Sequence, residues 1–282
     1  MKTYPTIKGE NDLEPVPAHI CRLGSIPLAA KRELKSEYLV VREKDNRKDK
    51  HNKEFRRVCT KMINLCDVMN LKVIMFTSFG QESGKTFTAL NLAKSMALVH
   101  KKRVVMLDTD LHTAKLSKMI SDPPVGLISY LNKSIYNEKI LLYNCFSNGS
   151  KGFDVIPAGK VPVSNPSDFL TQKEDRLKEL IAWLKCKYDY VFLNSMPVNC
   201  LAEADIADNY AGLAVFVLRE NHTDRRRLGD LEKICQMKQY KKMALILNGS
   251  KMKKTGAADI SKIFILVLSV FLGMLIGFLM VV

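Results

Sequence analysis

Three consecutive segments between residues 71 and 99 constrain the fold of this chain more than any other stretch. Residues 72–77 are a continuous apolar run, which is typical of a strand buried on both faces. Residues 85–100 have the apolar spacing of a helix. The turn between them ends in Gly84-Lys85-Thr86, the last residues of a Walker A phosphate loop. This order predicts a nucleotide-binding α/β unit; the alternative is an ordinary lysine at the start of a helix.

The residues expected to contact the nucleotide form one run: Gly80, Gln81, Glu82, Ser83, Gly84, Lys85, Thr86 and Phe87. Backbone N–H groups of such a loop can surround a triphosphate. Lys85 can reach the outer phosphates, and the hydroxyl of Thr86 can bind Mg²⁺. The first glycine of the usual pattern is missing, because Phe79 occupies its position.

Apolar runs and helical patterns alternate along the rest of the chain. The predicted strands are 72–77, 103–108, 153–157, 189–194, 211–218 and 243–248. The predicted helices are 55–71, with Phe55, Val58, Met62, Leu65 and Val68 toward the sheet, and 85–100, 166–187, 201–209 and 224–237. This alternation predicts a parallel sheet with helices on both faces and a ligand site at the carboxyl ends of its strands.

Two strands end in residues suited to phosphate chemistry. Asp108 and Asp110 follow the strand after the phosphate loop, where carboxylates hold Mg²⁺ or orient the reacting group. Solvated loop acids are the alternative. The apolar run of a later strand ends in Asn194, at a position where P-loop proteins normally have aspartate. An amide there can bind a metal-bound water but carries no charge and accepts no proton. Thr86, Asp108 and Asn194 are therefore the expected metal ligands.

Residues 263–282 contain no charged side chain, and their length is sufficient for a transmembrane helix. Lys251, Lys253, Lys254 and Lys262 precede this stretch, so we expect the main domain on the cytoplasmic side. The net charge of +15 is then explained by attraction to the anionic lipid of the inner leaflet, which is an expected partner. The seven cysteines have neither metal-site nor disulfide spacing, which favours a reducing cytoplasm. We do not expect nucleic acid as a partner, because no recognition helix is evident.

An ordered set of segments resembles the cytoplasmic domain of bacterial tyrosine kinases of capsule and exopolysaccharide systems (BY-kinases). The resemblance covers roughly residues 20–250. The segments are Leu23-Gly-Ser-Ile-Pro27, the loop from Phe76 to Thr86, Val105-Met-Leu-Asp108-Thr-Asp110, Phe153-Asp-Val-Ile-Pro-Ala-Gly159, Asn165-Pro166, Tyr188-Asp-Tyr-Val-Phe-Leu193 and Leu245-Ile-Leu-Asn248.

The resemblance implies a P-loop NTPase fold of the MinD/ParA type and phosphoryl transfer from ATP-Mg²⁺ to a protein tyrosine. Lys85, Asp108 and Asp110 would be the catalytic residues, and Asn248 would lie near the adenine. The implied domains are a leading segment at 1–66, the kinase-like domain at 67–255 and the membrane helix at 263–282. The implied partners are the polysaccharide polymerisation and export machinery with its chain-length regulators, at the bacterial inner membrane.

The chain departs from the family pattern at four places. Asn194 replaces the Walker B aspartate, and His112 stands where an arginine is usual. The family's assembly helix aligns with Lys53, Arg56 and Cys59, so one of its three charges remains, although self-association is still an option through Gly273 and Gly277. The nine tyrosines form no cluster at the C-terminus.

These departures leave two further functions open. One is a nucleotide-binding pseudokinase that acts as a scaffold, because Asn194 removes a metal-organising carboxylate. The other is a partition or division-site ATPase of the MinD/ParA group. That group carries an additional lysine early in its phosphate loop, and Gly80 stands at this position here.

Overall fold

The computed structural model describes residues 4–29, 40–41, 49–119, 125–133, 137–145, 152–159, 165–198, 209–238 and 240–251. Met1–Ser250 forms one compact unit and Lys251–Val282 a second, of which only Lys251 is described. The predicted membrane helix at 263–282 lies outside the described residues. Among the helices that are described, none is long and apolar enough to cross a membrane.

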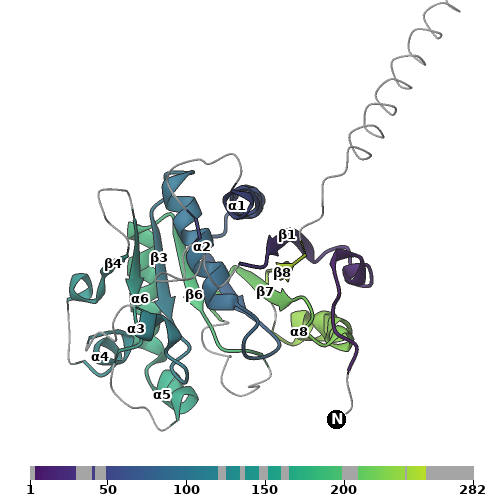
Figure 1. Ribbon diagram of the computed structural model, residues 1–282. Coiled ribbons are helices and arrows are strands. Elements are labelled where there is room, and N and C mark those ends of the chain that lie inside the picture. Colours follow the sequence, from purple (N-terminus) through teal and green to yellow (C-terminus); the bar gives the residue numbers. More distant parts are fainter. Residues whose placement is uncertain are drawn as a thin grey trace, which may run out of the picture. The chain divides into compact units, whose positions relative to one another are not determined.

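The centre of the first unit is an eight-stranded sheet with the order β1-β8-β7-β2-β6-β3-β5-β4 (Figure 1). Its strands are β1 (Cys21–Pro27), β2 (Val73–Thr77), β3 (Val104–Asp108), β4 (Tyr143–Cys145), β5 (Phe153–Ile156), β6 (Tyr190–Asn194), β7 (Leu213–Arg219) and β8 (Lys242–Ser250). All neighbours pair in parallel except β4, which is antiparallel to β5. The predicted parallel α/β sheet is confirmed for its six predicted strands. Two strands were not predicted: β1, a seventh parallel strand, and the antiparallel β4.

Helices cover both faces of this sheet, as predicted. The helices on one face are α1 (Lys50–Met69) and α2 (Lys85–Leu98), whose apolar side chains share a core with alternate residues of β2 and β6. Those on the other are α4 (Leu127–Leu131), α5 (Pro166–Gln172), α6 (Glu174–Lys187) and α8 (Asp230–Met237). The short helices η1 (Glu10–Leu13), α3 (Lys115–Met119), η2 (Glu138–Leu141) and η3 (Arg225–Gly229) complete the described set.

Several predicted helices differ in detail from the observed ones. The predicted helix 166–187 is divided at Lys173, and the predicted helix 224–237 starts as the 3₁₀ turn η3 before α8. In α1, Phe55 is fully buried but Val68 is 84% exposed, so the prediction that Val68 faces the sheet was wrong. Asn70, directly after the last residue of α1, has a left-handed backbone conformation that ends the helix where the chain turns toward β2. Most of the predicted helix 201–209 lies outside the described residues.

Candidate functional site

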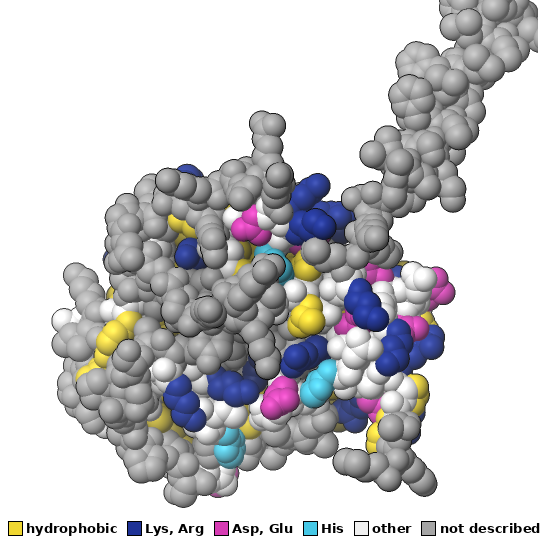
Figure 2. All heavy atoms as spheres, viewed as in Figure 1, with side chains coloured by type: hydrophobic (Ala, Val, Ile, Leu, Met, Phe, Trp, Pro, Cys, Tyr) yellow, Lys and Arg dark blue, Asp and Glu magenta, His cyan; other side chains and the backbone are white. Residues whose placement is uncertain are grey.

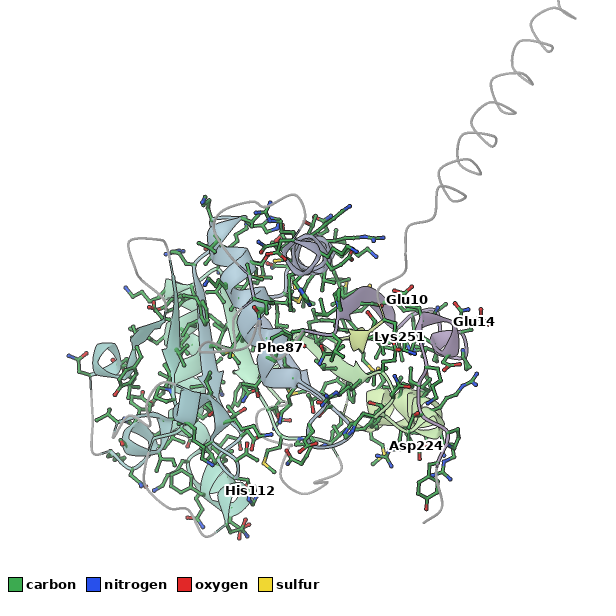
Figure 3. All side chains as sticks on the ribbon, viewed as in Figure 1. Glu10, Glu14, Phe87, His112, Asp224 and Lys251 are labelled. Atoms are coloured by element: carbon green, nitrogen blue, oxygen red, sulfur yellow. The ribbon has the colours of Figure 1, made fainter. Side chains whose placement is uncertain are left out.

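The phosphate loop connects the carboxyl end of β2 to the first residue of α2, Lys85. Residues 80–87 line a cavity of about 420 Å³, together with Lys115, Lys118 and Arg219. A volume of this size is in the range of small-molecule sites. Figure 3 labels Phe87 at the beginning of α2, on the side where the loop enters the helix. The sequence therefore predicted the loop that forms this cavity.

Gly84 permits the tight approach of the loop to β8. Its φ of 85° lies in the left-handed region that glycine adopts without strain. A Cβ atom at this position would come within 2.0 Å of Nδ2 of Asn248. Asn248 is buried and its Nδ2 donates a hydrogen bond to the Ser83 carbonyl at 3.0 Å. The structure thus brings Asn248 into contact with the loop backbone, and its expected place beside adenine stays a prediction.

Lys85 and Asp110 form a buried ion pair. The Nζ–Oδ2 distance is 2.8 Å, and the side chains are 7% and 1% exposed. Lys85 comes from the first turn of α2, and Asp110 follows β3 by two residues. Before a phosphate is bound, Asp110 supplies the negative charge that a buried ammonium requires.

Thr86, Asn194 and Asp108 form a buried chain of hydrogen bonds beside this ion pair. The hydroxyl of Thr86 donates to Oδ1 of Asn194 at 3.1 Å, and Nδ2 of Asn194 donates to Oδ1 of Asp108 at 2.9 Å. The sheet register explains the contact, because Asp108 and Asn194 are paired residues at the ends of adjacent parallel strands. The three side chains predicted as metal ligands therefore lie together.

The carboxyl group of Asp108 has an unusual environment. Burial raises its pKa to about 7, outweighing the hydrogen bond from Asn194. Asp110 raises the pKa further, whereas Lys85 lowers it. The second oxygen, Oδ2, is buried and has no well-formed hydrogen bond within the described part of the chain. The backbone of Ser117 lowers the pKa of Asp108 only as the smallest of the contributions. A buried carboxylate oxygen without a well-formed hydrogen bond is suited to receive a cation or a proton.

Four residues of the site were not anticipated from the sequence. Lys115 and Lys118 of α3 line the cavity, as does Arg219 at the end of β7. His222, in the turn after β7, lies with Nε2 3.0 Å from the Gln81 carbonyl. The basic residues give the cavity positive charge that complements a polyphosphate. His112, another of the four departures from the family pattern, is exposed in the loop after β3.

Comparisons with known proteins agree with this geometry. A family profile described as an AAA domain matches residues 71–208. The tyrosine-protein kinase Wzc of Salmonella typhimurium is 32% identical over 148 residues, which cover 52% of this chain and 20% of that protein. The tyrosine-protein kinase YwqD of Bacillus subtilis is 29% identical over 212 residues, covering 73% of this chain and 84% of the relative.

A solved structure shows the same fold over most of the chain. The BceF tyrosine kinase domain superimposes with a TM-score of 0.72 at 25% identity, covering 88% of this chain and all of that domain. The chain spans a quarter or less of the length of the enterobacterial relatives from Klebsiella and Salmonella. The similarity to those longer proteins is therefore confined to one part of them.

Proposed function

Because this chain carries the P-loop domain of the bacterial tyrosine kinase family, we propose that it binds ATP and transfers the terminal phosphoryl group to a protein tyrosine. The acceptor tyrosine would belong to a neighbouring copy or to the chain itself. The relatives are named tyrosine-protein kinases, which supports this class of reaction for the present chain.

One observation carries the proposal. The Lys85–Asp110 ion pair and the Thr86–Asn194–Asp108 chain lie at neighbouring strand ends, next to a cavity lined by the phosphate loop. Lys85 would exchange its bond to Asp110 for one to phosphate oxygens, which releases the Asp110 carboxylate. Asp108 would accept the proton of the tyrosine hydroxyl or serve on the metal side.

The oxygen atoms of Thr86, Asn194 and Asp108 fit a magnesium ion. All three side chains are buried, and Oδ2 of Asp108 lacks a well-formed hydrogen bond within the described residues. Oxygen ligands of this kind are those that Mg²⁺ prefers. When bound, the ion would neutralise charge on the phosphates. Asn194 contributes a neutral amide, so the site holds one negative charge fewer than a site with aspartate.

The proposed setting is the inner face of the bacterial plasma membrane. Residues 263–282 would anchor the chain, with the kinase domain in the cytoplasm near anionic lipid. Phosphorylation would regulate the machinery that polymerises and exports capsule or exopolysaccharide, through its chain-length regulators. The uncharged twenty-residue stretch supports the membrane setting, and the resemblance of the sequence motifs to the BY-kinases supports the role in polysaccharide export.

Asn194 favours a second candidate, a nucleotide-binding scaffold with weak or no kinase activity. Loss of a metal-organising carboxylate can slow a reaction by on the order of 10²–10⁴-fold. Nucleotide binding would persist, because Lys85 and the loop backbone are unaffected. Both candidates share the same bound ligand and differ in chemistry.

The test is phosphotyrosine formation by the purified chain with ATP and Mg²⁺, beside Asn194→Asp and Lys85→Ala. We expect a signal from the wild type, a stronger one from Asn194→Asp, and none from Lys85→Ala. A wild type that binds ATP without phosphotyrosine, beside an active Asn194→Asp variant, would establish the scaffold instead. Absence of ATP binding by the wild type would refute both.

A further inference from the structure

Three successive carbonyl groups of the phosphate loop are each held by a side chain from outside the loop. The His222 ring (Nε2) contacts the Gln81 carbonyl at 3.0 Å, and the Arg219 guanidinium donates to the Glu82 carbonyl at 2.6 Å. The Asn248 amide donates to the Ser83 carbonyl at 3.0 Å. All three donors belong to β7, β8 or the turn after β7, so one side of the loop is bound along its length.

Peptide geometry turns these contacts into a constraint on the loop N–H groups. In a trans peptide the C=O bond and the N–H bond of the next residue point in opposite directions. The chain has no cis peptide bond among its described residues. Holding the carbonyls of Gln81, Glu82 and Ser83 toward β7 and β8 therefore directs the following three N–H groups, up to that of Gly84, the opposite way.

The loop needs such support because its sequence is poor in glycine. Glu82 has a φ of 59°, in the left-handed region that costs a non-glycine residue roughly 1–2 kcal/mol. A strained residue persists only where its surroundings determine its conformation. The carbonyl of this same residue accepts the 2.6 Å bond from Arg219.

Backbone hydrogen bonds hold the turn that carries His222. Within the turn, Thr223 N donates to the Arg219 carbonyl at 2.9 Å. The N-terminal segment binds the other side, since Ile7 N donates to the Thr223 carbonyl and Asn221 N donates to the Ile7 carbonyl. Figure 3 labels Asp224 at this end of the molecule, where the N-terminal segment meets the turn.

We propose that Arg219, His222 and Asn248 are positioning residues, which hold the phosphate loop ready for a polyphosphate by fixing its three carbonyl groups. The functional role of the ordered loop rests on the proposed nucleotide binding, but the order of the loop can be measured without nucleotide. Arg219 also lines the cavity, so a direct contact with the ligand is the competing explanation for any loss of affinity.

The experiment measures backbone order and nucleotide affinity for the full chain and for four alanine variants: Arg219→Ala, His222→Ala, Asn248→Ala and Arg225→Ala. Arg225 is the matched control, because it lies beside the same turn and pairs with Asp12 at 3.3 Å instead of the loop. Order parameters of Glu82, Ser83 and Gly84 come from ¹⁵N relaxation of nucleotide-free protein. Affinity for ADP comes from calorimetry.

We expect order parameters of about 0.85 in the wild type and in Arg225→Ala, and values that fall to about 0.6 in the other three alanine variants. ADP affinity should fall about three- to tenfold for each of them, which is the effect of one hydrogen bond. His222→Gln restores a side-chain N–H donor and should recover part of the order and of the affinity. Residues of β2 should keep wild-type order, which shows that the variants are folded.

Unchanged loop order in all three variants overturns the inference, even if affinity falls, since the loss would then come from direct contacts. Changed loop order together with lower affinity supports it. A wild type that binds no ADP but loses loop order in the variants would refute the proposed function and leave the positioning role standing. A second check is Glu82→Gly, which removes the strain and should reduce the effect of Arg219→Ala.

Discussion

Gly84 is the residue at which the shape of the phosphate loop is least tolerant of change. Gly84→Ala would place a Cβ atom 2.0 Å from Nδ2 of Asn248, on a backbone with φ of 85°. We expect the free energy of unfolding to fall by about 1–3 kcal/mol and ADP affinity to fall about tenfold or more. Thermal denaturation and calorimetry measure the two effects.

Gly80→Ala is the control for that substitution. A Cβ atom at Gly80 would meet no heavy atom within 4 Å, and its backbone is not left-handed. This variant should keep the wild-type free energy of unfolding. An equal loss of stability in both variants would show that the loop depends on glycine for flexibility and not on the contact with Asn248.

The sequence predicted some residues of the site and not others, for a physical reason. The roles proposed for Lys85, Thr86, Asp108 and Asn194 depend on their own side-chain chemistry, at positions that follow from the strand ends. Arg219 and His222 contact backbone carbonyl groups of residues more than a hundred positions earlier in the sequence. Any donor of suitable length could do this, so the residue type alone carries no signal.

At the scale of elements, α1 shows how much a helix depends on one buried face. Phe55 is fully buried and its ring lies 6.0 Å from that of Phe87 on α2. Phe55→Ala should lower the free energy of unfolding by about 3–5 kcal/mol, through lost burial and a cavity. Val68→Ala on the same helix should change it by less than about 0.5 kcal/mol, because Val68 is exposed. Denaturant titration of both variants is the measurement, and similar losses would contradict this packing.

Continuous apolar runs predicted the central strands β2, β3, β6, β7 and β8 within two residues at each end. The edges of the sheet were harder to predict. The sequence Leu23-Gly-Ser-Ile-Pro27 reads as a turn-rich apolar piece, yet it forms most of β1. Glycine and proline are tolerated there because β1 has one neighbour, β8, and an irregular register with it. The strand β4 has three residues, too few for a periodic signal.

At the scale of the whole molecule, the excess of basic residues predicts how the binding of the chain to lipid vesicles depends on salt. Lys and Arg side chains are spread over the described part of the face in Figure 2, with Asp and Glu between them. We expect the full chain to remain on anionic vesicles in about 1 M salt, where charge attraction is screened beyond about 3 Å. A chain without residues 263–282 should bind at low salt and be released at high salt.

Vesicle flotation measures both parts of this prediction, with uncharged lipid as the control. The full chain should float with either lipid, and the shortened chain only with the anionic one. Release of the full chain by salt would show that residues 263–282 do not insert, and the anchor would have to be abandoned. Binding of the shortened chain to uncharged lipid would contradict the electrostatic explanation.

The pairing of β1 with β8 has a consequence for folding during synthesis on the ribosome. Cys21 in the first strand, β1, pairs with Ala244 in the last strand, β8. The strand that leaves the ribosome first therefore cannot pair until the last strand has been synthesised. Until translation has passed that point, the nascent polypeptide exposes a strand edge that could pair wrongly. Such long-range closure slows folding, and chaperones that shield unpaired strands should therefore associate with ribosome-bound chains and leave after release.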